Sequence, residues 1–333
     1  MRKVNSKDVA REAGVSQATV SYVLTGREDQ TIRAETRRKV LDAAELLGYF
    51  PNLAARALVT GKTHTIALWV PFSHHSVFGH VIEQIMHLAL KSGYRVVIAQ
   101  TAGETSETLG SSGLLSDWHV DGILAFDATE MVNKVLDQCP GVSPIVSFGP
   151  TYSDRTDHVG IDLYEGSLRA VRYLAEIGCS RIAYSGFQPR LFPGEPRYDA
   201  YMKVMQEIGA KPIVIPLLRG EYEDAYHGIR DHIAAFGCPD GLFCWNDEAA
   251  IGANRAFADL GLRVPEDVAL IGSDGIRETA YCVPGLSTIA QPFEEMCRLA
   301  WDFLQRRLQE PSHPVQHALL PMQMEKRAST NRE

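Results

Sequence analysis

The sequence lacks long hydrophobic runs and has few cysteines, and these two features limit the classes of protein to which it can belong. The longest apolar stretches among its 333 residues, such as residues 66–71, are far too short to span a bilayer. The first residues contain no apolar core segment, which argues against a signal peptide. The six cysteines include no CxxC pair, so a disulfide or zinc framework is not indicated. We therefore expect a cytoplasmic protein with no membrane partner.

Motifs for catalysis and cofactor binding are also missing. No GxGxxG follows the early strands, and no nucleophile elbow occurs. TGKT at residues 60–63 resembles a phosphate-binding loop, but Arg56 stands where that loop needs its first glycine. His74, His75 and His80 lack nearby cysteines and the HExxH spacing of a zinc site. The sequence therefore predicts that the protein is not an enzyme and that it binds no cofactor and no metal.

Charge is divided unevenly along the chain. The net charge is −8, but residues 1–62 carry +4 and the remainder carries −12. A basic segment on an acidic body is typical of a polyanion-binding module. The alternative for this segment is a helical hairpin that docks on the main body.

Three short helices are expected in the first fifty residues. Ser6 can cap the first, which Gly14 ends, and Ser16 can cap the second. A third is expected from about residue 34 to residue 47, with Gly48 as its stop. Two helices joined by so tight a turn are typical of a helix-turn-helix domain, in which the second helix presents its N-terminal residues to the major groove.

The second helix has distinct faces. Val20, Val23 and Leu24 share an inward face, which leaves Gln17, Ala18, Ser21 and Tyr22 pointing outward. The run AGVSQATVSYVL, followed by TRRKVLDAAELLGYFPNLAARAL, resembles the DNA-binding head of the lactose-repressor (LacI) family nearly position by position. The resemblance implies double-stranded DNA as a partner. It also implies base contacts from Gln17, Ala18 and Tyr22, with Ser16, Thr19 and Ser21 near phosphates.

Some positions differ from the pattern of this family, and others extend the resemblance beyond the second helix. Thr25 stands where the family usually has Asn, and Arg33 replaces a capping Ser and can contact phosphate instead. The resemblance adds Asn52 to the DNA-binding set. It also implies a short hinge helix within residues 51–63, from which Ala55 and Leu58 enter the minor groove and kink the duplex. A plain linker is the alternative for this segment.

From Thr65 onward, short apolar runs alternate with amphipathic stretches, which predicts doubly wound parallel sheets in two lobes. Segments such as FCWNDEAAIGANRAFADLGLRVPEDVALIGSDG resemble the effector-binding core of the same family, related to periplasmic binding proteins. The predicted fold is therefore an all-α helix-turn-helix head plus an α/β two-lobed periplasmic-binding-protein-like core. The expected boundaries are a head at 1–50, a hinge at 51–63 and a core at 64–333. Within the core we expect lobe 1 at 64–162 and 291–320, and lobe 2 at 163–290 and 321–333.

A ligand is expected between the lobes, at the carboxyl ends of the strands. Asn246 and Asp274 follow predicted strands, and the resemblance implies that they bind an effector together with Arg197, Tyr222 and Phe78. Each has a plainer alternative: Asn246 and Asp274 can cap helices, and Arg197 can form a surface ion pair. The motif Gly272–Gly275 (GSDG) departs from the family pattern, so a plain pentose or hexose is not assumed.

These observations predict a homodimeric transcriptional repressor that binds a pseudo-palindromic operator under the control of a small polar effector, carbohydrate or other. The effector's identity and whether it is inducer or corepressor stay open, since both would use one cleft. A solute-binding receptor with the same two-lobed body is a second hypothesis, and steep salt dependence of DNA binding would distinguish them. An enzyme on a doubly wound fold is a third, tested by turnover.

Overall fold

The computed structural model divides the chain into two units, a head (Met1–His64) and a body (Thr65–Glu333). No helix among the described residues is both long and apolar enough to cross a membrane. The residues that the structure describes are 4–24, 32–49, 57, 61–71, 76–101, 119–138 and 144–332.

The described part of the head holds three helices, α1 (Ser6–Ala13), α2 (Gln17–Leu24) and α3 (Ala34–Leu46). The prediction that Ser6 caps α1 was wrong. Asn5 is the cap, because its side chain accepts from two backbone N–H groups while Asp8 accepts from the N–H of Asn5. Gly14 ends α1 as predicted, in a left-handed conformation with φ of 66° that glycine adopts without strain.

A small apolar core joins these three helices. Val9 from α1, Val20 from α2 and Val40 from α3 are fully buried, and smaller side chains surround them. The predicted inward face of α2 is thereby confirmed for Val20 and Val23. Because this core is small, the loss of even two methylene groups affects a large share of it.

The described strands of the body form two six-stranded sheets, in which every neighbouring pair is parallel except β10 and β12. The first sheet has the order β11 (His317–Pro321), β5 (Asp157–Asp162), β4 (Ile145–Gly149), β3 (Gly122–Phe126), β1 (Thr65–Val70) and β2 (Arg95–Gln100). The second has the order β12 (Gln323–Glu325), β10 (Ser287–Ala290), β9 (Ala269–Asp274), β8 (Gly241–Cys244), β6 (Ile182–Phe187) and β7 (Ile213–Leu217).

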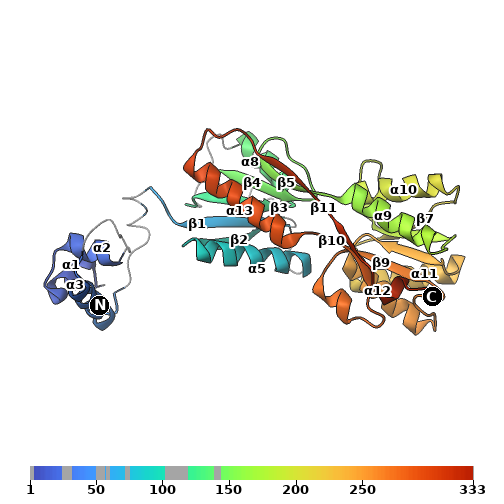
Figure 1. Cartoon of the computed structure of the whole chain (residues 1–333), viewed down its shortest axis with the longest axis horizontal. Coiled ribbons are helices and arrows are strands. Elements are labelled where there is room, and N and C mark those ends of the chain that lie inside the picture. Colours follow the sequence, from blue (N-terminus) through green and yellow to red (C-terminus); the bar gives the residue numbers. More distant parts are fainter. Residues whose placement is uncertain are drawn as a thin grey trace. The chain divides into compact units, whose positions relative to one another are not determined.

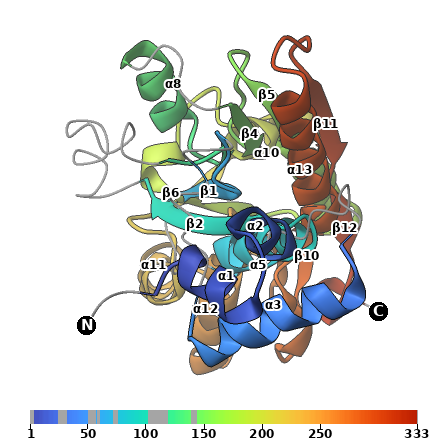
Figure 2. The ribbon, with the colours of Figure 1, turned by 90° about the vertical axis from the view of Figure 1, so that its left-hand side faces the viewer.

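Helices cover both faces of each sheet, which defines lobe 1 around the first sheet and lobe 2 around the second. In lobe 1, α5 (Ser76–Lys91) and α13 (Phe293–Gln309) pack on one face and α8 (Thr129–Gln138) packs on the other (Figure 2). In lobe 2, α9 (Leu163–Glu176) and α10 (Pro196–Glu207) lie opposite α11 (Tyr222–Phe236) and α12 (Asp247–Asp259). Strands buried on both faces explain the continuous apolar runs in the sequence, such as TIALWV.

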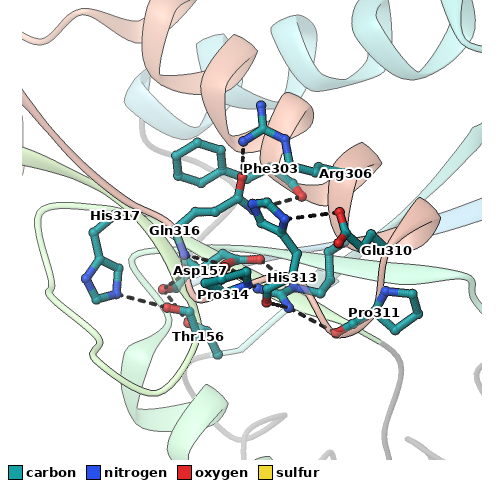
Figure 3. A network of polar contacts seen from close by, with 12 residues as sticks. Thr156, Asp157, Phe303, Arg306, Glu310, Pro311, His313, Pro314, Gln316 and His317 are labelled. Atoms are coloured by element: carbon teal, nitrogen blue, oxygen red, sulfur yellow. Dashed lines mark hydrogen bonds and ion pairs between the residues drawn. The ribbon is translucent and has the colours of Figure 1, made fainter.

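The chain passes between the lobes three times, after β5, after β10 and after β11 (Figure 1). The third connection is anchored by the network shown in Figure 3. Arg307 donates to both carboxylate oxygens of Asp157, at 2.8 and 3.0 Å, and to the carbonyl oxygens of three residues in the loop between α13 and β11. The N–H of Gln316 donates to the same Asp157 carboxylate. This ion pair between the half-buried Arg307 and the buried Asp157 fixes the start of β11 and hence the strand that leads into the second lobe.

Candidate functional site

The N-terminal turn of α2 is pre-organised by its own cap. The hydroxyl of Ser16 accepts from the backbone N–H of Thr19 at 3.1 Å and hydrogen-bonds the Thr19 hydroxyl at 2.9 Å, which confirms the predicted cap. The side-chain amide of Gln17 donates to the hydroxyl of Ser6 at 2.8 Å. This bond orients the side chain of Gln17 and uses one of the two N–H groups of its amide.

The outer surface of α2 matches the predicted reading surface. Gln17, Ala18 and Ser21 are exposed, and Tyr22 is half-buried. Arg33 is exposed at the cap position of α3 and makes no side-chain capping bond, as expected for a residue that replaces a capping serine. These side chains are presented without being needed for the core of the head.

Other predicted residues lie outside the described residues: Thr25, Asn52, Ala55, Leu58, His74 and His75. Of the predicted hinge helix, only Ala57 is described as helical, and its carbonyl oxygen accepts from the N–H of Gly61 at 2.8 Å. Within the described ranges, no group of three or more His, Cys, Asp or Glu side chains is placed to hold a metal ion.

A cleft of about 1200 Å³ is lined by both lobes of the body. Four of the five predicted effector residues line it, namely Phe78 from lobe 1 and Arg197, Asn246 and Asp274 from lobe 2. The exposed fraction of each of the four is 8% or less, so their side chains are buried within the walls of the cleft. The structure therefore brings together residues that are nearly 200 positions apart in the sequence.

Arg197 is a buried cation with buried acidic neighbours. Its Nη1 lies 3.3 Å from the Glu195 carboxylate, and its guanidinium lies 5.1 Å from the ring centroid of Trp245. Burial alone would lower the pKa of Arg197, but the carboxyl groups of Glu195 and Asp274 raise it above the ordinary value. The ion pair that was the alternative for Arg197 exists, but it is buried in the cleft instead of lying on the surface.

Asp274 ends β9 with a φ of 136°, a conformation that L-residues rarely adopt. Its Oδ1 accepts from the side-chain NH₂ of Gln291 at 2.7 Å. It does not cap the short helix that follows, whose first backbone groups have no side-chain cap. Burial and the neighbouring Asp247 carboxyl raise the pKa of Asp274 well above its ordinary value. Backbone strain and a desolvated carboxyl are both typical of ligand sites.

Asn246 fills the structural role that was its alternative. Its Oδ1 accepts from the N–H of Ala249 at 2.7 Å, which caps α12, and its NH₂ donates to the Gly220 carbonyl oxygen at 3.1 Å. Because Asn246 also lines the cleft, capping fixes the side chain in place at the ligand side of the helix.

The two remaining predicted positions differ in their placement. Phe78 packs edge-to-face on Phe126, with 5.6 Å between ring centroids, at the lobe 1 wall. Tyr222 is not among the described residues that line the cleft. Burial and the nearby Glu248 carboxyl raise the pKa of Tyr222, and Glu248 accepts a hydrogen bond from the Ser76 N–H at 2.9 Å. Since Ser76 belongs to lobe 1 and Glu248 to lobe 2, this cluster joins the lobes beside the cleft.

Sequence reasoning missed several cleft residues. Trp245 supplies the aromatic ring beside Arg197, and Asp127 adds a carboxyl whose pKa is raised by burial. Asp127 directly follows β3, Trp245 follows β8 and Gln291 follows β10, so all three lie at the carboxyl ends of strands, where the sequence analysis expected the ligand. Glu195 lies in a loop, where only its position two residues before Arg197 hinted at pairing.

Comparisons with known proteins agree with this architecture. Residues 6–52 match the family model described as bacterial regulatory proteins, lacI family, and residues 171–330 match a periplasmic binding protein-like domain. The HTH-type transcriptional repressor PurR of Vibrio vulnificus is 30% identical over 311 residues, 92% of each chain. PurR of Pectobacterium carotovorum is 31% identical over 319 residues, 93% of each chain. The lac repressor bound to ONPG in the repressed state superimposes with a TM-score of 0.83 at 25% identity, covering 98% of this chain and 100% of that one.

The helix-turn-helix head, the two-lobed body and relatives that span nearly the whole chain lead to one assignment. The chain belongs to the LacI family of bacterial regulatory proteins.

Proposed function

We propose that this protein is a cytoplasmic, homodimeric repressor that binds a pseudo-palindromic operator and is controlled by a small molecule in the cleft between its lobes. The observation that carries this function is the exposed, capped N-terminal turn of α2 on a head that matches the family model. The curated relatives are transcriptional repressors, which also supports regulation over catalysis for this chain.

The exposed face of α2 reads the operator in this proposal. Gln17 contacts an adenine and Ala18 a thymine methyl group, with Tyr22 beside them. Ser16, Thr19 and Ser21 contact phosphates and set the register of the helix in the major groove. Arg33 also contacts a phosphate, Thr25 and Asn52 complete the DNA-binding set, and the minor groove receives Ala55 and Leu58 from the hinge.

The cleft provides the control. Phe78, Arg197, Asn246 and Asp274 bind the effector, and Tyr222 contributes through the Ser76–Glu248 contact that joins the lobes. Because effector and operator are linked through one molecule, each changes the affinity of the other by the same factor. An inducer and a corepressor would occupy the same cleft, and the sign of the coupling is read from the binding experiment.

Selection of genomic fragments tests this function. Purified full-length protein is incubated with sheared genomic DNA of its source, with and without the source's small-molecule extract, and the retained fragments are sequenced. We expect a recurrent pseudo-palindrome with a deformable central step. The Gln17→Ala variant should show weaker enrichment of that sequence, while Glu45→Ala, at an exposed position of α3, should show the wild-type enrichment. Uniform retention under both conditions would contradict the proposal.

A further inference from the structure

Ser6 has a hydroxyl group that the cap of α1 does not use. Asn5 caps this helix, because its Oδ1 accepts from the N–H groups of Lys7 and Asp8. The Ser6 hydroxyl instead accepts from the side-chain NH₂ group of Gln17 at 2.8 Å, across eleven positions of the sequence. The proposed function assigns no role to Ser6, yet its hydroxyl contacts the side chain that is proposed to read a base.

Both ends of this hydrogen bond lie on ordered backbone. On α1, Oδ2 of Asp8 accepts from the N–H of Asn5 at 3.1 Å, which completes a reciprocal cap. On α2, the hydroxyl of Ser16 accepts from the N–H of Thr19 at 3.1 Å and fixes the first turn. The two helices also share the buried core of the head. The bond therefore restrains the Gln17 side chain between two fixed helices, which lowers the entropy that it loses on binding.

The same hydrogen bond contributes little to the stability of the fold. It lies on the surface of the head, where Gln17 is exposed and Ser6 is half-buried. α1 and α2 are already held together by Val9 and Val20, which are fully buried. A surface hydrogen bond replaces bonds to water, so its net gain in free energy is small. Its main effect is on the orientation of the Gln17 amide.

This orientation decides which base the amide can recognise. A glutamine amide has two N–H donors and one carbonyl oxygen. With one N–H of Gln17 donated to Ser6, the other N–H and Oε1 are left for the major groove. This donor–acceptor pair matches adenine, whose N7 accepts and whose N6 donates. Guanine presents two acceptors, N7 and O6, so a restrained Oε1 would face O6 and repel it.

An unrestrained amide lacks this selectivity. When it turns by half a rotation, its NH₂ group replaces Oε1 and both N–H groups can face the two acceptors of guanine. We propose that Ser6 is a positioning residue for base recognition, whose hydroxyl holds the Gln17 amide in the orientation that reads adenine and rejects guanine. This inference rests on the proposed function, in which Gln17 of α2 reads the operator.

Substitution of Ser6 tests the inference by fluorescence anisotropy of the full-length protein on three duplexes. The first carries the pseudo-palindrome from the DNA selection. The second replaces the adenine contacted by Gln17 with guanine in both half-sites, and the third has a scrambled sequence. The contacted adenine is identified as the position at which Gln17→Ala lowers the base preference most. The wild-type protein should bind the adenine duplex at least about tenfold more tightly than the guanine duplex.

Ser6→Ala should lower this adenine-to-guanine affinity ratio at least threefold, because the freed amide accommodates guanine. Ser6→Thr keeps a hydroxyl group at this position and should keep the ratio within twofold of wild type. In the Gln17→Ala background, Ser6→Ala should not change the ratio further, because the side chain that it positions is absent. Glu12→Ala, at an exposed position of α1, is the matched control and should keep the wild-type ratio. Affinity for the scrambled duplex should stay within twofold in both Ser6 variants, as expected of a folded head.

Four results would overturn the inference. These are an unchanged ratio in Ser6→Ala, an equal loss of affinity for all three duplexes in that variant, a further fall of the ratio when Ser6→Ala is added to Gln17→Ala, or a wild-type preference for guanine. An equal loss on all duplexes would indicate that Ser6 is only structural.

The DNA selection separates these failures from failure of the proposed function. A protein that enriches a pseudo-palindrome but gives one of the four results contradicts the positioning role of Ser6 alone. A protein that enriches no sequence contradicts the proposed function itself.

Discussion

The head and the body place their candidate functional residues in opposite environments. On the head, Gln17, Ala18 and Ser21 stand exposed on a helix whose buried side carries Val20 and Val23. In the body, Arg197 and Asp274 are desolvated, and the pKa of each is raised. The head can therefore change its reading residues at little cost to its stability. In the cleft, burial strengthens the electrostatic interactions of these side chains. It also makes the stability of the fold depend on the same residues that are candidates for ligand binding.

The largest expected effect tests whether buried ion pairs hold the body together. Arg307→Met leaves the Asp157 carboxylate buried without its cation and should lower the free energy of unfolding by about 3–5 kcal/mol. Every tryptophan lies beyond residue 64, so urea titration followed by tryptophan fluorescence reports on the body alone. Arg298→Met, which removes an exposed pair with Asp302, should cost less than about 0.5 kcal/mol. Equal midpoints for the two variants would contradict the role given to the Figure 3 network.

The second prediction concerns the small core of the head. Val20→Ala removes two methylene equivalents from a fully buried position and should destabilise the head by about 2 kcal/mol. DNA binding should weaken at least tenfold, while the tryptophan-detected transition of the body stays unchanged. Leu46→Ala, at an exposed position of α3, is the matched control and should leave both readouts at wild-type values. A shifted body transition in Val20→Ala would show that the two units are energetically coupled.

The third prediction removes one reading side chain without disturbing the core. Gln17→Ala should cost about 1.5 kcal/mol, roughly tenfold, in discrimination between the operator and the same duplex with its contacted A·T pair changed. Stability of the head should change by less than about 0.5 kcal/mol, because Gln17 is exposed and its hydrogen bond to Ser6 lies on the surface. Fluorescence anisotropy on the two duplexes measures the effect. Unchanged discrimination would assign base reading to other residues of α2.

The smallest expected effect is a pH dependence set by the cleft. The raised pKa of Asp274 means that the folded protein keeps a proton that the unfolded chain loses above about pH 3.9. The stabilising contribution of this carboxyl is therefore present at low pH and is lost as the pH rises. Asp274→Asn keeps an oxygen that can accept from Gln291 but removes the charge. The stability of this variant relative to wild type should thus increase between pH 4 and pH 7 in urea titrations, and a constant difference would contradict the assigned cause.

Much of this arrangement could be predicted from the sequence because it depends on local patterns. Gly14 and Ser16 mark helix ends through their own backbone and hydroxyl chemistry, and Asn246 and Asp274 follow strands whose apolar runs identify them. The cap of α1 was misassigned because Asn5 and Ser6 are adjacent and both favour capping. Only the structure shows that the side chain of Asn5 accepts the hydrogen bonds from the first N–H groups of α1.

Features that depend on distant residues were not predictable in this way. The contact between the Ser76 N–H and the Glu248 carboxylate joins positions 172 residues apart, and neither belongs to a motif. The position of Tyr222 outside the described lining follows from the same cluster. Likewise, the cation–π contact of Arg197 with Trp245 requires α10 and β8 to meet at one end of lobe 2. Such contacts are set by sheet order, which local periodicity does not encode.

The most direct test of the central claim, that α2 of the head reads a specific operator, is a salt titration of full-length protein on two fluorescent duplexes. One duplex carries the selected pseudo-palindrome and the other a scrambled sequence of the same composition. We predict at least about 1,000-fold tighter binding to the pseudo-palindrome and a linear fall of log affinity with log salt for both duplexes. Equal affinity for the two duplexes at every salt concentration, with and without the effector, would contradict the claim.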